Sequence, residues 1–217
     1  MRTKTLTSIA LTIFMLLSAL CLVRPEGKNH DKRILAAELT LETTQDGNQE
    51  SQTYVNSDGD PVIPLDRDYA TLLRTKDDDG NVVLEQYLDA QGEPVVRSGN
   101  YAAVSYRREA GEMWITYLDA QLKPTTITSG YSSIHRTLTP DGKALRDTYF
   151  DLLGRPVKNS GGYYGFLGGY DDRGRVREIV YLDAYGNPIQ IKAGYSREVR
   201  VLDGAGRIAA VYYRDGE

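Results

Sequence analysis

The chain has 217 residues, a formal net charge of −4 and an isoelectric point near 5.3. This acidic balance argues against a nucleic-acid-binding protein, because such a protein needs a clustered basic surface to hold phosphates. Length alone allows one or two domains, so the organisation of the chain must be inferred from its internal pattern.

The N-terminal residues carry a signal for export. Met1–Lys4 is basic, and an uncharged apolar run follows from Leu6 to Val23. As a helix this run extends roughly 27 Å, near the lower limit for crossing a bilayer. Cleavage after Cys21 is the alternative, with Ala19 at a small-residue position before it. We expect residues 1–23 to be a retained membrane anchor or a cleaved signal peptide, and the rest to be extracytoplasmic.

The only cysteine, Cys21, lies inside this apolar run, so the sequence offers no internal disulfide. A lipoprotein signal is excluded by Leu20, which stands before Cys21 where a small residue is required. Residues 24–39 form a polar linker, and Ile34 to Leu41 is predicted as a short helix or a first strand.

A repeat organises the remainder of the chain. Tyrosines recur at intervals of 33, 30, 32, 32 and 32 residues. A constant period of this length is typical of a repeat array rather than an irregular globule. We expect one array over residues 40–217, with units that start at 54, 87, 117, 149 and 181. The tyrosines that mark the period are Tyr54, Tyr87, Tyr117, Tyr149, Tyr181 and Tyr213.

Glycine and proline mark two turns in each unit. A glycine follows the opening tyrosine by five residues, except that Leu122 replaces it once, and a proline follows two residues later. Another glycine precedes the next opening tyrosine by six or seven residues. Asp-Gly pairs suit tight hairpin turns because glycine adopts positive φ freely. The prolines cannot donate to a strand ladder and are expected at strand starts or sheet edges.

Short runs rich in strand-forming residues lie between the turns. We predict strands at Val82–Leu88, Met113–Leu118, Val176–Leu182 and Ile208–Tyr213. A single hairpin is marginally stable in water, so the units must stack on one another to build a core. The predicted fold class is all-β, an elongated antiparallel β-hairpin array arranged as a meander or a solenoid, behind an N-terminal apolar helix.

A second tyrosine series lies fourteen or fifteen residues after the first and is preceded by Gly or Asn in four of five copies. A tyrosine ring can stack between hairpins or on a sugar ring. The opening tyrosines are predicted to be core or half-buried residues. The second series is either structural or ligand-binding, and the single tryptophan is a further candidate contact. The candidate ligand-binding residues are Tyr101, Trp114, Tyr131, Tyr163 and Tyr195.

Catalytic and metal-binding patterns are sparse. The two histidines, His30 and His135, cannot build a zinc site of the usual spacing. His135 has no Gly-x-Ser-x-Gly elbow with it and is interpreted as a surface or cross-strand residue. The run Asp77–Asp79 is interpreted as an acidic hairpin turn, with a weak calcium site as the alternative, because its glycine does not fit an EF-hand loop. No catalytic residue, metal ligand or cofactor is predicted.

The stretch Tyr170-Asp171-Asp172-Arg173-Gly174-Arg175-Val176 and the later Tyr181-Leu182-Asp183-Ala184-Tyr185-Gly186 resemble the tyrosine-aspartate (YD or RHS-type) β-repeats of bacterial surface and toxin-shell proteins. Those units are nearer twenty residues long. The array is also similar to the aromatic-glycine hairpins of bacterial cell-wall-binding modules, which rely on tryptophan, and to Tyr-Leu-Asp-Ala-x-Gly-x-Pro-Val arrays of membrane-attached bacterial proteins. The resemblance covers the repeats only and implies no catalytic residue.

Two functions fit these observations. The first is a non-enzymatic, exported, membrane-anchored module that binds cell-envelope glycan or glycopolymer through repeated tyrosine-lined grooves, with avidity from multiple weak sites. The second is a structural spacer or protein-interaction scaffold at the cell surface. A repeated exposed aromatic face favours the first function, and tyrosines buried between units favour the second. An enzyme would require His135 to lie in a pocket beside an acid or hydroxyl partner.

Overall fold

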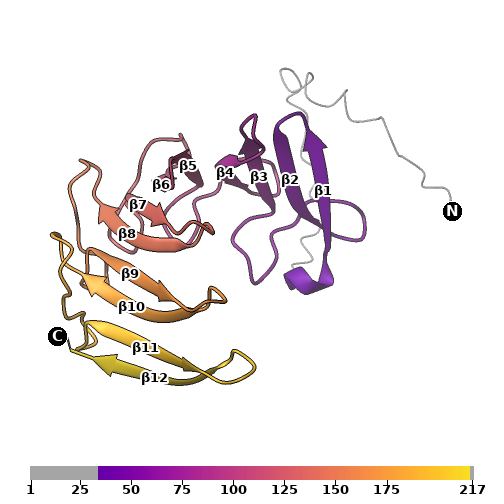
Figure 1. The fold of residues 1–217 in the computed structure, drawn as a ribbon. Helices are drawn as coiled ribbons and strands as arrows, with labels where there is room; N and C mark the ends of the chain where they lie inside the picture. The colour runs from indigo at the N-terminus through magenta and orange to yellow at the C-terminus, as the bar shows by residue number, and fades with distance from the viewer. Residues whose placement is uncertain (1–33, 216–217) are drawn as a thin grey trace. The chain divides into compact units, whose positions relative to one another are not determined.

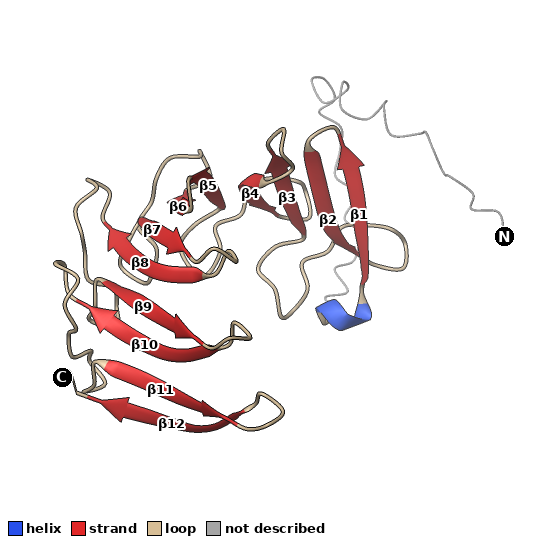
Figure 2. Ribbon diagram, in the orientation of Figure 1, coloured by secondary structure: helices blue, strands red, loops and turns tan. Residues whose placement is uncertain are grey.

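The computed structural model describes residues 34–215, and this part of the chain is almost entirely β-structure (Figures 1 and 2). One short 3₁₀ helix, η1 (Ala36–Glu38), precedes the strands. The twelve strands are β1 (Thr40–Asp46), β2 (Gln49–Val55), β3 (Thr71–Lys76), β4 (Val82–Leu88), β5 (Ala103–Glu109), β6 (Glu112–Leu118), β7 (Ser133–Leu138), β8 (Ala144–Phe150), β9 (Gly165–Tyr170), β10 (Val176–Leu182), β11 (Arg197–Leu202) and β12 (Ile208–Arg214).

The strands form a single sheet in which every strand pairs antiparallel with its neighbours in the chain, in the order β1 to β12. The prediction of an all-β array of hairpins is therefore confirmed, and the meander, not the solenoid, is its form. The predicted strands Val82–Leu88 and Val176–Leu182 coincide with β4 and β10. Each opening tyrosine lies near the end of a hairpin's second strand, so the structural unit is a hairpin followed by a loop.

The hairpin turns after β3, β9 and β11 share one spacing of Asp and Gly, and Thr139 takes the place of the Asp in the turn after β7. In the β3–β4 turn, the Asp77 carboxylate accepts hydrogen bonds from the amides of Asp79 and Asn81 at 3.1 and 2.8 Å. Gly80 takes a φ of +82°, which glycine adopts without steric cost. The interpretation of Asp77–Asp79 as an acidic hairpin turn is thus confirmed.

A second turn of the same design follows each hairpin. The amides of Gln91 and Glu93 both donate to the Asp89 carboxylate at 2.9 Å. The proline beyond this turn then forms an isolated antiparallel bridge with the end of the strand, as Pro94 does with Leu88. The same bridge recurs at the other four prolines, which agrees with their predicted place at strand edges.

Each unit also contains a third turn, which the sequence reasoning did not predict. It closes through a hydrogen bond from the Arg97 amide to the Tyr101 carbonyl, 2.8 Å long, and Asn100 within it has a φ of +66°. Gly130, Gly162 and Gly194 have positive φ at the equivalent position. In these four units the residue before the second tyrosine is therefore Gly or Asn because the backbone there requires positive φ, which explains the pattern without a bound group. The first unit has Asp68 at this position, without positive φ.

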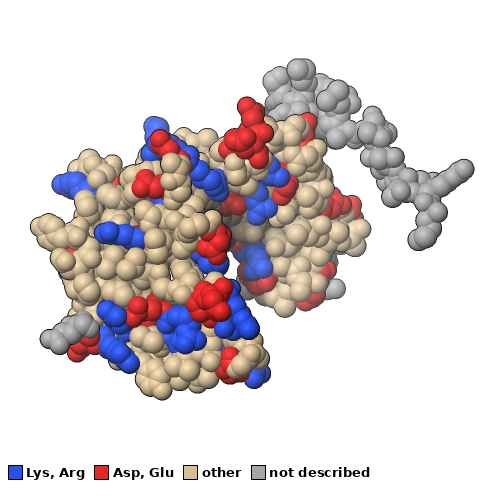
Figure 3. Space-filling view, in the orientation of Figure 1, with Lys and Arg blue, Asp and Glu red and all other residues tan. Residues whose placement is uncertain are grey.

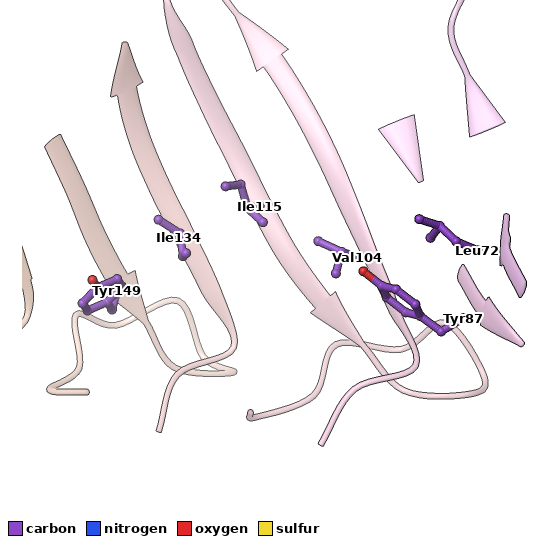
Figure 4. Close-up of a cluster of buried hydrophobic side chains, with 6 residues drawn as sticks. All are labelled: Leu72, Tyr87, Val104, Ile115, Ile134 and Tyr149. Atoms are coloured by element: carbon purple, nitrogen blue, oxygen red, sulfur yellow. The ribbon is translucent and has the colours of Figure 1, made fainter. Parts of the chain in front are cut away.

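The hydrophobic core lies along one face of the sheet. Side chains from consecutive strands meet there in a line, and all six members of the central cluster are less than a tenth exposed (Figure 4). Because successive residues of a strand point to opposite faces, each strand contributes its alternate residues to this core. The cluster consists of Leu72, Tyr87, Val104, Ile115, Ile134 and Tyr149.

The predicted apolar helix at residues 6–23 and most of the linker lie outside the described residues. The stretch from Ile34 to Leu41 contains both of the predicted alternatives, since η1 is followed directly by β1. Within residues 34–215 there is no helix with the length and apolar character needed to span a bilayer.

Candidate functional site

The two tyrosine series form one continuous stack, which we call the tyrosine ladder. Rings of the second series alternate with rings of the first, and neighbouring ring centroids are 4.4 to 6.2 Å apart, within the range of favourable aromatic contacts. The ladder runs in the order Tyr54, Tyr69, Tyr87, Tyr101, Tyr117, Tyr131, Tyr149, Tyr163, Tyr181, Tyr195 and Tyr213.

The ladder has a physical origin in the repeat. The first series is held by the second strand of each hairpin, while the third turn of the following loop holds the second series. Consecutive third turns are joined to each other by backbone hydrogen bonds, such as Ser160 N–H to Ser129 C=O at 2.7 Å and Lys192 N–H to Gly161 C=O at 3.0 Å. The strands that hold the first series and the third turns that hold the second series are each hydrogen-bonded from unit to unit. The two series therefore repeat at the same spacing, and their rings interdigitate.

Burial of the ladder agrees with a structural role for the first series. Tyr87 and Tyr149 are 7 % and 6 % exposed, and Tyr117 and Tyr181 are half-buried, which confirms the prediction for these residues. The candidate ligand-binding residues of the second series are also half-buried, and each has a ring of the first series on either side. Their ring faces are thus largely used for packing within the ladder.

Burial also changes the acidity of the ladder. It raises the pKa of Tyr87 to about 12, and it raises the pKa of Tyr131, Tyr149 and Tyr181 as well, because a phenolate loses solvation in this environment. These hydroxyl groups therefore stay protonated at neutral pH and act as neutral polar groups along an otherwise apolar stack.

Trp114 is separated from the other candidate residues by the sheet itself. It stands three positions before Tyr117 on β6, so it points to the opposite face. There it stacks on His135 with a centroid distance of 4.3 Å and an interplanar angle of 11°, and His135 Nε2 lies 3.1 Å from a Glu112 carboxylate oxygen. His135 is the cross-strand neighbour of Trp114, as its interpretation as a cross-strand residue expects.

One arginine, Arg97, packs against the rings of the tyrosine ladder. The Arg97 guanidinium carbon lies 4.3 Å from the ring centroid of Tyr87 and 5.1 Å from that of Tyr69, which is cation–π geometry. Its Nε donates to Asp68 at 2.8 Å. Ile127 occupies the position of Arg97 in the next unit. An arginine at a repeat position that is apolar in the next unit is the sequence signal that could have identified this site.

An open cavity of about 410 Å³ adjoins this arginine. Its walls come from the loops of the first two units, and the third turn of the first unit contributes most of them. Asp66 accepts a hydrogen bond from the Ala36 amide at 2.8 Å, while Asp68 is satisfied by Arg97 and Ser98. The cavity therefore presents polar groups that are mostly paired already. The lining residues are Leu65, Asp66, Arg67, Asp68, Arg97 and Ser98.

The acidic side chains of the described residues form turns rather than a metal site. Within residues 34–215 no group of three or more His, Cys, Asp or Glu side chains is arranged to hold a metal ion. The repeated Asp side chains serve their own turns instead. Backbone N–H donors hold the pKa of Asp151 and of Asp203 below the ordinary value, because the ionised carboxylate accepts those hydrogen bonds.

Comparison with known proteins assigns no family to the chain. No protein-family model matches it, and no curated protein sequence matches it. What stands is the architecture itself: a meander of antiparallel β-hairpins with regularly spaced tyrosines.

Proposed function

We propose that the chain is a non-enzymatic, exported scaffold, a repeat array that spaces or docks a partner at the cell surface. One observation carries this proposal: the second-series tyrosines pack between the rings of the first series in the ladder. Rings used in this way stabilise the sheet and leave little free face for a ligand. The apolar run at residues 6–23 supports export and membrane anchoring.

The resemblance to YD-type repeats of surface and toxin-shell proteins is compatible with this role, since it implies no catalytic residue. A scaffold needs a length determined by its number of units and a surface set by its loops. The sequential strand order meets the first need, because each unit pairs only with its neighbours in the chain.

Removal of one full period tests the proposal. Deleting residues 117–148 joins Thr116 to Tyr149, which restores a complete strand at the junction. We expect the shortened chain to remain folded by circular dichroism, and the distance between labels on β2 and β12 to fall by up to about 10 Å, two strand spacings. Loss of folding, or an unchanged distance, would contradict a scaffold built from independent units.

Glycan binding is a second candidate function, and the open cavity beside Arg97 is the observation that favours it. Titration of the full chain with peptidoglycan and teichoic-type polymers separates the two. The scaffold proposal expects no saturable binding. Saturable binding that is lost in Tyr163→Phe and Tyr195→Phe, which keep the rings and remove only hydroxyl groups, would restore the glycan-groove function. Binding lost only on Ser98→Ala would assign the glycan to the cavity.

A further inference from the structure

Four large apolar side chains are exposed at the tips of the turns that follow β6, β8 and β10. Leu122, Leu152 and Leu153 are 46 %, 55 % and 74 % exposed, and Tyr185 is 90 % exposed. We call these four residues the apolar turn stripe. The three turns follow alternate strands of one sheet, so their tips recur at about 10 Å, twice the spacing between strands. Neighbouring exposed apolar side chains of this kind mark interaction surfaces.

Leu122 shows that an apolar side chain is retained here at a conformational cost. Its φ is +59°, while the equivalent position in the other four turns is glycine with φ from +72° to +89°. Positive φ disfavours a branched L side chain. Because Leu122 is also 46 % exposed, it gains little from the core in return. A strained residue that does not stabilise the fold points to a role in binding.

The backbone of these tips is already satisfied from within. In the turn after β8, the amides of Leu153 and Arg155 donate to the Asp151 carboxylate at 2.9 Å, and the Gly154 amide donates to the Asp151 carbonyl at 3.0 Å. The turn after β10 repeats this arrangement on Asp183. Tips with internally bonded amides can enter an apolar environment without leaving these donors unpaired.

The charge beside the tips changes along the array. Lys123 and Arg155 lie one residue after the glycine position in the turns that follow β6 and β8, and both are exposed. Asp60 and Glu93 occupy the same position in the first two turns, whose tips are polar. The two leucine tips are therefore followed by basic residues and the polar tips by acidic ones, while Asn187 holds this position beyond Tyr185. Arg155 also pairs with Asp151 of its own turn at 2.8 Å. Figure 3 shows Lys and Arg interspersed with Asp and Glu over the face in view.

From these observations we infer that the apolar turn stripe is a lipid-contact surface, with its leucines and Tyr185 inserted into the interface of a bilayer that carries anionic headgroups. Leucines with an adjacent Lys123 or Arg155 suit this environment, since the leucines enter the acyl boundary and the cations meet the headgroups. The three tips lie at the same end of their strands and insert together, so their weak contributions to membrane binding combine. The inference rests on the membrane-side location in the proposed function.

Depth-sensitive fluorescence on the full chain in vesicles tests this inference. A single label is placed by Tyr185→Cys in a Cys21→Ser background, and the matched control carries the label at Gln91→Cys in a polar tip. The vesicles contain equal amounts of phosphatidylcholine and phosphatidylglycerol, with brominated phosphatidylcholine as quencher. We expect quenching of the label at 185 and none at 91. Equal quenching at both positions, or none at either, overturns the inference.

Two substitutions separate lipid contact from stability. Leu153→Ser is expected to weaken insertion about tenfold, the effect of losing one leucine from the apolar phase. Leu65→Ser, at a leucine 53 % exposed in a different loop, should leave the quenching unchanged. Leu122→Gly should reduce quenching and at the same time raise the urea midpoint. If that variant is more stable and fully quenched, the stripe does not contact lipid.

The outcomes distinguish other occupants and the proposed function. Self-association in the absence of lipid, lost in Leu153→Ser and without quenching in vesicles, would assign the stripe to a second copy of the chain and overturn the lipid surface. The period deletion removes Leu122 from the stripe but is read out without lipid, and the glycan titrations use neither lipid nor the stripe. A failed scaffold proposal therefore leaves the quenching result interpretable, and the reverse also holds.

Discussion

The carboxylate of Asp147 accepts two hydrogen bonds from the guanidinium of Arg136, each 2.7 Å long, and the Asp147 side chain is only 3 % exposed. The pair spans β7 and β8 on the face of the ladder. The hydrogen bonds that Arg136 donates to Asp147 raise the pKa of Arg136, so the half-buried guanidinium remains charged. We expect Asp147→Ala to destabilise the array by about 1–3 kcal/mol, because it leaves the guanidinium of Arg136, 27 % exposed, without its acceptors.

Urea unfolding measures this loss, and the exposed pair Asp203–Arg207 supplies the control. Arg207 is 81 % exposed in that pair, so Arg207→Ala should change the unfolding free energy by less than about 1 kcal/mol. The double variant Arg136→Met with Asp147→Leu should recover most of the stability, because apolar residues of similar size can replace a buried pair. Asp147→Ala as mild as Arg207→Ala would show that the pair is hydrated.

Tyr149 should contribute strongly to stability through the ladder. Its ring stacks on Tyr131 at a centroid distance of 4.5 Å and is 6 % exposed. Truncation by Tyr149→Ala should therefore destabilise the array by on the order of 3 kcal/mol, as for other buried aromatic residues. Tyr185→Ala, at a ring 90 % exposed, should stay within about 0.5 kcal/mol. A loss below half a kilocalorie at Tyr149 would mean that the ladder does not stabilise the sheet.

Alkaline pH should unfold the array. Burial raises the pKa of Tyr87 to about 12 in the folded chain, against about 10 for a tyrosine in the unfolded chain. Above pH 10 the unfolded state loses its phenol proton while the folded state keeps it, so the unfolded state is favoured as pH rises. The contribution is fully present below about pH 10 and lost by about pH 12.

The check is a series of urea midpoints at rising pH, together with tyrosinate absorbance. Other ladder tyrosines with raised pKa values act in the same direction, so the transition should be steep. Tyr87→Phe removes one titrating group and should make the fall in stability shallower by about 1–3 kcal/mol across this window. A pH profile that Tyr87→Phe leaves unaltered would indicate that the folded state ionises as readily as the unfolded state.

Gly165 is placed where no larger residue fits. A Cβ at this position would lie 2.0 Å from the Asp147 carbonyl oxygen, because β9 approaches β8 closely there. Gly165→Ala should destabilise the array by about 1–3 kcal/mol, the usual effect of overpacking. Gly204→Ala is the matched control, since a Cβ there meets no atom within 4 Å. Equal midpoints for the two variants in thermal unfolding would show that the strands separate without cost.

Local chemistry allowed much of this fold to be predicted. The strand Val82–Leu88 and the turn at Asp77 follow from strand propensity and from the preference of Gly80 for positive φ, which depend only on nearby residues. The third turn is also signalled in the sequence, by the Gly or Asn before four of the five second-series tyrosines, but such a residue is equally compatible with the close approach of a ligand, so both interpretations stayed open. The β5–β6 hairpin, in the unit that starts at Tyr87, is two residues shorter than the other hairpins between ladder tyrosines and takes positive φ at both Ala110 and Gly111, which accounts for the period of 30.

The alternation of the two tyrosine series could not be predicted from residue spacing, because it depends on strand register and on hydrogen bonds between loops of different units. The separation of Trp114 from Tyr131 depends on the same register, since a shift of one residue would exchange the faces of the sheet. Arg97 and its cavity arise where two loops meet. Properties that require two distant segments to be placed together are the ones that residue spacing does not supply.

The sequential strand order also bears on how such a gene can change. Every unit presents to the next the same surface that it receives from the previous one, so a recombination event that gains or loses one whole period joins partners that already match. An event that removes one strand of a hairpin would break the alternation of rings at the junction, whereas the units of 30 and 33 residues show that turns and loops can change in length without breaking it. Large variation in the length of this protein is therefore expected in whole units, with small variation confined to turns and loops.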